Sequence, residues 1–125
     1  MLRLIYIGAG SAIGGILRYA VSGAVHRVLS GEFPFGTMVV NLSGSLIVGF
    51  LWGLFETAAV SRDVRIFLLI GILGSFTTFS TFSLENMNLF LSREYGYFLI
   101  NIIATVILGL AFVFIGFSLS KQMIA

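Results

Sequence analysis

The sequence has no cysteine, a single proline and few charged side chains. The absence of cysteine excludes disulfides, thiolate metal sites and thiol nucleophiles. Charged residues make up only 10% of the chain, whereas soluble domains carry about a quarter. Seven basic and five acidic residues give a net charge of +2, which is too small for a nucleic-acid footprint. The composition therefore argues against a soluble enzyme, and we expect no nucleic-acid partner.

Hydrophobic residues account for 58% of the 125 residues and gather in long stretches. Residues 33–55, 66–84 and 95–120 contain no charge, and each stretch is long enough to cross the roughly 30 Å hydrocarbon layer of a bilayer. An N-terminal stretch is interrupted only by Arg18. We therefore predict an all-α integral membrane protein with one four-helix membrane domain over residues 1–125. The expected spans cover about residues 3–28, 35–57, 65–91 and 95–121.

The basic residues specify orientation only weakly. With four spans both termini face the same side, and we compare the arginines and lysine outside the spans. The terminal side carries Arg3, Arg62, Arg65 and Lys121, and the other side carries Arg27 and Arg93. Because this difference sets orientation, a small one allows insertion in both directions, and two opposed copies could then pair about an axis in the membrane plane. A single orientation with a modest bias is the alternative.

Glycines recur at helical spacing in the first two spans. Gly10 with Gly14 and Gly49 with Gly53 form GxxxG pairs. Lipid gives helices no hydrophobic drive to associate, so small residues that let backbones approach closely mark packing faces. We expect these glycines to lie at contacts between helices.

The third span holds an unusual polar sequence. Hydroxyl side chains and phenylalanines alternate over residues 75–83. Gly74 with Ser75, followed by the β-branched Thr77 and Thr78, is a poor place for continuous helix, so we predict a helix break near residues 74–78. Carbonyls freed there could bind Na⁺, as unwound transporter helices do. Alternatively, the hydroxyls bond back to their own helix.

Phe76, Phe79 and Phe82 recur at every third position of the same span. An aromatic stripe at this spacing is often simply core. The hydroxyl groups between these rings favour another interpretation, because Ser and Thr supply the hydrogen-bond donors that an anion needs, and a phenyl ring adds its electropositive edge. The pattern therefore suits a small anion better than a cation.

Further polar residues lie inside the spans. Asn41 is in the second span, and Asn101 and Thr105 lie one turn apart in the fourth. Buried polar residues in a membrane are functional candidates because of their cost, although they can also bond neighbouring helices together. Arg18 could draw anions into a vestibule. Glu85 would oppose that attraction, so we interpret it as structural.

Three segments together resemble a known family. They are residues 74–85 (GSFTTFSTFSLE), 35–44 (FGTMVVNLSG) and 14–19 (GGILRY). They closely resemble the CrcB or Fluc family of bacterial fluoride channels, and the resemblance covers the whole chain. It implies a dual-topology antiparallel homodimer with two fluoride pores and a central structural Na⁺. The implied function is passive, selective export of fluoride from the cytoplasm by a multi-pass protein of the bacterial inner membrane, which reduces fluoride toxicity.

The resemblance also implies residue roles. The backbone oxygens of Gly74 and Thr77 would bind the Na⁺, which is structural and not transported. The ring edges of Phe79 and Phe82 would line the pores, and Asn41 would donate to fluoride.

Other pore residues carry hydroxyl or amide groups. Ser80 and Thr81 would belong to the hydroxyl track, and Arg18 would lie near the aqueous entrance. Asn101 and Thr105 are placed in the pore from their spacing alone. Ser75 stands where many members of the family have a second glycine.

Two other classes remain to be weighed. A small multidrug antiporter also has four spans, but it needs a deep titratable carboxylate, and Glu85 lies late in the third span. A purely structural membrane subunit would leave the hydroxyl-rich span unexplained. Because the sequence offers no general base, nucleophile or catalytic metal cluster, we expect no enzyme.

Overall fold

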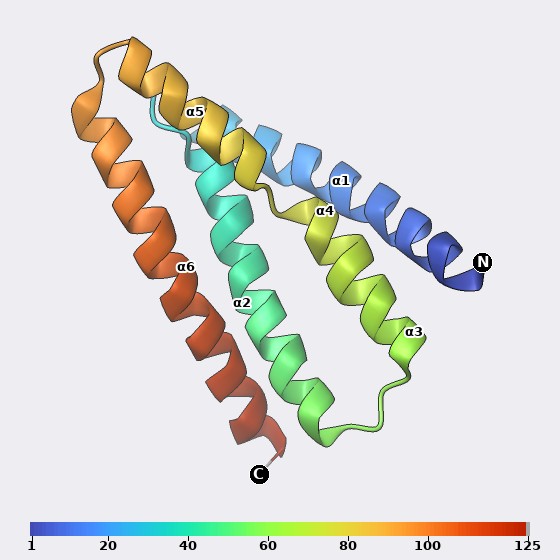
Figure 1. Ribbon diagram of the computed structural model, residues 1–125. Coiled ribbons are helices and arrows are strands. Elements are labelled where there is room, and N and C mark those ends of the chain that lie inside the picture. The colour runs from blue at the N-terminus through green and yellow to red at the C-terminus, as the bar shows by residue number, and fades with distance from the viewer. Residues whose placement is uncertain (125) are drawn as a thin grey trace.

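The protein is all-helical over residues 1–124, which are the residues that the computed structural model describes. Figure 1 shows long helices that run past one another with short connections. Four helical segments are long and apolar enough to cross a membrane, and the described residues include no strand. This confirms the all-α class and the four membrane-capable helices. The segments are Leu2–Val28, Phe35–Thr57, Arg62–Leu91 and Tyr95–Ile124.

Three of the four segments are single helices, and the remaining one, Arg62–Leu91, is composite. The single helices are α1 (Leu2–Val28), α2 (Phe35–Thr57) and α6 (Tyr95–Ile124). The composite segment contains α3 (Arg62–Arg65), a π-helical stretch η1 (Ile66–Leu73), α4 (Gly74–Phe76) and α5 (Phe79–Leu91). Thr77 (φ −77°, ψ 156°) and Thr78 (φ −150°, ψ 118°) have extended backbone between α4 and α5. Gly74 and Ser75 are helical, so the interruption lies on the two threonines.

Helices α2 and α6 run side by side through glycines (Figure 1). The Val113 carbonyl occupies the space that a Cβ at Gly49 would need, and the Leu46 carbonyl does the same at Gly116. Such contact brings backbones together without any side chain between them. The predicted glycine face of the second span therefore packs as expected.

Helix α1 packs on η1 in the same way. A Cβ at Gly10 would lie 2.9 Å from the Cα of Gly71, and one at Gly14 would collide with the Ile72 carbonyl. Both GxxxG faces of the sequence are thus confirmed as contacts. They hold α1 against the first half of the composite segment and α6 against α2.

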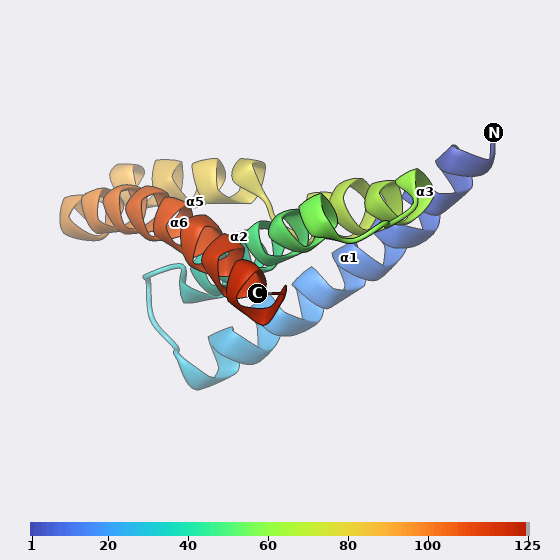
Figure 2. The same cartoon turned by 90° about the horizontal axis from the view of Figure 1, so that it is seen from below.

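Seen from below, α2 passes between α5 and the C-terminal half of α1 (Figure 2). This places the interruption between α4 and α5 beside α2, near the middle of the molecule. Ion pairs lie at the other end of α2, where Lys121 Nζ is 2.8 Å from Glu56 Oε2 and Arg3 Nε is 3.4 Å from Asp63 Oδ1. The polar residues of the third span are therefore remote from the charged end that holds both termini.

Candidate functional site

A cavity of about 380 Å³ lies beside the interruption, between α2, α5 and α6. We call it the uncharged cavity, because none of its lining residues, all of them described, carries a charge. It brings together six of the residues singled out in the sequence, namely Asn41, Gly74, Thr77, Phe79, Phe82 and Thr105. Ser80 and Asn101 do not line it, and Thr81 faces a second cavity described below.

The Asn41 side chain holds the interruption together. Its Nδ2 donates to the Thr78 carbonyl at 3.0 Å, and its Oδ1 accepts from the Thr78 N–H at 2.8 Å. A buried backbone group without a partner costs about 1–3 kcal/mol. A single amide from α2 therefore pairs both backbone groups of a residue that lies outside any helix.

The hydrogen bonds at the interruption leave the carbonyls of Gly74 and Thr77 without their helical donors. In an unbroken helix the Thr78 N–H would donate to the Gly74 carbonyl and the Thr81 N–H to the Thr77 carbonyl. Here they donate instead to Asn41 Oδ1 at 2.8 Å and to Thr78 Oγ1 at 3.2 Å. The oxygens left without these donors belong to the two residues that the family resemblance assigns to Na⁺. Within residues 1–124 no cluster of three or more His, Asp or Glu could hold a metal, so a cation would rely on such oxygens.

Two phenylalanine rings border the cavity with opposite exposure. The ring centroids of Phe79 and Phe82 are 5.8 Å apart and the planes are tilted by 39°. Phe82 is 9% exposed, whereas Phe79 is 79% exposed in the single chain. The wall of the uncharged cavity is therefore closed on the Phe82 side and open on the Phe79 side.

Thr78 is the centre of the hydroxyl groups that follow. Its Oγ1 accepts from the Thr81 N–H and also bonds Thr81 Oγ1 at 3.1 Å and Ser80 Oγ at 3.3 Å. From the sequence, Thr78 was expected only to help break the helix, and this role was not predicted. The signal was available, because a threonine directly before a helix is a favoured N-cap. The hydroxyl of Thr78 thus caps α5 and orders its neighbours.

Asn101 is buried behind the cavity wall and does not face the cavity. It is 1% exposed, donates to Asn86 Oδ1 at 3.2 Å and accepts from Thr105 Oγ1 at 3.3 Å. Asn86, which the sequence analysis did not consider, donates in turn to the Phe82 carbonyl at 2.8 Å. The cost of burying an asparagine in a membrane-spanning segment could have identified it.

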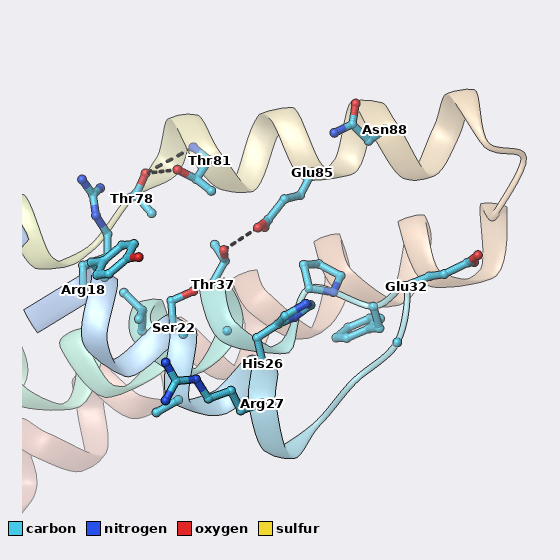
Figure 3. Close-up of a pocket in the computed structure, with 18 of the residues that line it drawn as sticks. Arg18, Ser22, His26, Arg27, Glu32, Thr37, Thr78, Thr81, Glu85 and Asn88 are labelled. Carbon is cyan, nitrogen blue, oxygen red and sulfur yellow. Dashed lines mark hydrogen bonds between the residues drawn. The ribbon is translucent and has the colours of Figure 1, made fainter.

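A larger cavity of about 1020 Å³ lies on the other side of Thr78. Its lining includes Arg18, His26, Arg27, Glu32, Glu85 and Glu94, and we call it the charged cavity. Figure 3 shows Arg18, His26 and Arg27 on α1, Glu32 on the α1–α2 connection and Glu85 on α5. Glu94 comes from the connection between α5 and α6. Thr78 lines both cavities, so the two meet at the start of α5.

Glu85 enters the charged cavity from α5. Its Oε1 accepts from the Thr37 hydroxyl at 2.6 Å, as Figure 3 shows. Its Oε2 is buried and has no hydrogen-bond partner within the described residues. A structural role for Glu85, as interpreted from the sequence, explains the bond that Oε1 makes. It does not explain why Oε2 is buried without a partner within the described residues.

Comparison with known proteins identifies the family. Residues 5–117 match the family model described as CrcB-like protein, Camphor Resistance (CrcB). A protein of Parabacteroides distasonis named "Fluoride-specific ion channel FluC" is 42% identical over 124 residues, which cover 99% of this chain and 97% of the relative. The protein of the same name from Desulforapulum autotrophicum is 42% identical over 120 residues, with 95% and 96% covered.

A third relative gives the same result at a lower identity. The protein of the same name from Desulfotalea psychrophila is 38% identical over 122 residues, with 98% of this chain and 94% of the relative covered. These relatives are named as channels and not as enzymes, in agreement with the expectation that this chain is no enzyme. Because the family model matches residues 5–117 of this chain, the chain belongs to the CrcB family.

Proposed function

We propose that the protein is a fluoride-selective channel that exports fluoride passively. The observation that carries this proposal is the uncharged cavity, where phenyl rings and hydroxyl groups surround a space without any fixed charge. The names of the relatives support it. A fixed positive charge would trap a small anion, whereas neutral donors and ring edges stabilise it more weakly and let it leave.

The two cavities have different roles in the proposed permeation. In the charged cavity a hydrated anion enters near Arg18, whose charge attracts it. Beyond Thr78 the space is about 380 Å³ and is bordered by Phe79 and Phe82. Because fluoride is strongly hydrated, passage requires that close donors replace its water shell. The hydroxyls of Thr78, Ser80 and Thr81 lie at this transition and are the natural replacements.

The proposal includes an antiparallel dual-topology homodimer with two pores. The 79% exposure of Phe79 supports a partner at this face, because a pore ring left open on one side needs another wall. Gly74 is also exposed beside it. A second, inverted copy placed over this face would cover both residues and supply the missing wall.

The proposal also includes a structural Na⁺ on the dimer axis. The carbonyls of Gly74 and Thr77 fit such an ion, because the N–H groups of Thr78 and Thr81 bond side-chain oxygens instead of them. Two opposed copies would present four such oxygens, which are the hard ligands that small cations prefer. The ion would hold the two interruptions together and would not be transported.

Fluoride efflux from liposomes tests the channel directly. The purified protein is reconstituted in vesicles loaded with fluoride or chloride, and a selective electrode follows the release of each anion after valinomycin is added under a potassium gradient. We expect rapid fluoride release, no chloride release and no dependence on a proton gradient. Phe82→Ile should slow the release, whereas Phe114→Ile, on an exposed face of α6 outside both cavities, should not. Absence of fluoride release from folded protein contradicts the proposal.

The alternative of a proton-coupled antiporter depends on Glu85. Its Oε2, which has no partner within the described residues and lies beside a wide cavity, is a feature that such an exchanger could use. The export direction and the location in the bacterial inner membrane belong to the channel proposal. A plain structural subunit would transport neither anion nor proton in the same vesicles.

A further inference from the structure

A chain of hydrogen bonds leaves the uncharged cavity and returns to it. The Thr105 hydroxyl donates to Asn101 Oδ1 at 3.3 Å, and Asn101 Nδ2 donates to Asn86 Oδ1 at 3.2 Å. Asn86 Nδ2 then donates to the Phe82 carbonyl at 2.8 Å. Thr105 and Phe82 both line the cavity, while Asn86 is 5% and Asn101 1% exposed. We call the two asparagines the amide relay.

The direction of every bond in this chain follows from its last member. A backbone carbonyl only accepts, so Asn86 must offer its NH₂ group to Phe82. Its Oδ1 therefore faces Asn101, which must answer with its own NH₂ group. The Oδ1 of Asn101 then faces Thr105, whose hydroxyl has to donate. Because both amides are buried, no water competes with these bonds.

The relay therefore fixes where the Thr105 proton lies. With its proton on Asn101, the Thr105 hydroxyl has only lone pairs left for the cavity. An anion beside Thr105 needs a hydrogen-bond donor. The Thr105 hydroxyl can donate to it only if the anion draws this proton away from Asn101. We infer that Asn86 and Asn101 are positioning residues, which keep Thr105 an acceptor until an anion arrives. This inference rests on the proposed channel function.

The relay would weaken the binding of an anion at Thr105, because one hydrogen bond must break when another forms. An anion that recruits the Thr105 proton exchanges one hydrogen bond for another, so its net gain is smaller than at a free hydroxyl. Conduction requires such a balance, because an ion must bind well enough to enter and weakly enough to leave. Without the relay the hydroxyl is free to donate, and the ion binds more tightly and leaves more slowly.

The unmodified protein and a set of variants test the relay in the vesicle assay. Asn86 and Asn101 are replaced together by Leu, since removal of both partners leaves no orphaned amide. We expect the fluoride concentration for half-maximal efflux to fall about two- to tenfold, which is the range of one hydrogen bond, while the maximal rate falls. Thr105→Val removes the hydroxyl and keeps its shape. In the Thr105→Val background the double substitution should shift nothing further, whereas Thr105→Ser should retain the shift.

Size-exclusion chromatography and circular dichroism check that each variant is folded. If the double variant is not folded, Asn101→Leu replaces it. That change removes the oxygen that accepts the Thr105 proton and so frees the hydroxyl as well. No shift in folded variants, or a shift that persists with Thr105→Val, overturns the relay alone. No fluoride efflux from the unmodified protein overturns the channel proposal and the relay with it.

Discussion

The two cavities differ in size and in charge, although they share Thr78. The charged cavity measures about 1020 Å³ and is lined by arginines, a histidine and glutamates. The uncharged cavity measures about 380 Å³ and is lined by apolar, hydroxyl and amide groups. The first offers room for a hydrated ion, and the charge of Arg18 attracts anions locally. The second offers little room and only neutral dipoles.

The two cavities also differ in whether the polar groups beside them have hydrogen-bond partners. In the charged cavity Glu85 keeps one oxygen without a partner. Beside the uncharged cavity the amides of Asn41 and Asn101 each make two hydrogen bonds. Satisfied amides fix the geometry of a site. We therefore expect substitutions around the uncharged cavity to be far more damaging than substitutions in the charged one.

Asn41→Leu should have the largest effect. Both backbone groups of Thr78 lose their partner, at about 1–3 kcal/mol each. Together the two losses amount to about 2–6 kcal/mol, and the lower value already corresponds to about a 30-fold slower fluoride efflux, at 1.36 kcal/mol for each factor of ten. The same losses also lower the thermal unfolding midpoint. Asn88→Leu, an exposed asparagine of α5 on the charged cavity, is the matched control and should leave efflux unchanged.

Asn41→Asp sharpens this prediction. It retains an oxygen for the Thr78 N–H but replaces the donor to the Thr78 carbonyl and adds a charge to the uncharged cavity. Efflux should be lost as in the leucine variant. Wild-type efflux and stability in either variant would show that the amide does not hold the interruption.

Thr78→Val should have an intermediate effect at the boundary of the cavities. Loss of its hydroxyl removes the N-cap of α5, which costs about 1 kcal/mol, and frees Ser80 and Thr81 from their common partner. We expect efflux to slow by about tenfold or less, in line with that cost. Thr78→Ser retains the cap and should stay close to wild type. Equal efflux in the valine and serine variants would exclude a role for this hydroxyl.

Much of this arrangement could be predicted from the sequence, because it depends on local patterns. The hydrophobic stretches gave four membrane-capable helices, and the glycine spacing gave their contacts. The poor helix sequence around Gly74 and Ser75 pointed to the region of the interruption. The extended residues are nevertheless Thr77 and Thr78, because Asn41 on another helix pairs the Thr78 backbone.

The roles of the asparagines could not be read from the sequence, because each depends on a partner on another helix. Spacing put Asn101 and Thr105 on one face, but it could not show that Asn86 on α5 meets Asn101 and turns it away from the cavity. Likewise, nothing local indicates that Thr37 on α2 meets Glu85. Contacts between helices decide whether a polar residue serves the pore or the packing.

Arg18→Gln should have a small effect that depends on salt. Arg18 lines the charged cavity, so its loss weakens the attraction of anions over a distance set by screening. At roughly 0.01 M ionic strength, where screening extends over about 30 Å, we expect efflux to slow a few-fold, and at 0.15 M the loss should nearly vanish. Arg62→Gln, at the other end of the molecule, should show no such change. A salt-independent loss would point to a structural role for Arg18 instead.

Glu85→Gln should change efflux least and separates the channel from the antiporter. The amide oxygen can still accept from the Thr37 hydroxyl, and removal of the negative charge slightly favours anions in the charged cavity. A channel should therefore conduct fluoride within about twofold of wild type, because Glu85 lines the wide charged cavity and not the uncharged one. An antiporter would instead lose transport together with proton movement, which a pH-sensitive dye in the vesicles reports. Loss of both fluoride transport and proton movement would show that transport depends on Glu85 and not on the uncharged cavity. Steady fluoride efflux without proton movement would assign permeation to the neutral groups beyond Thr78.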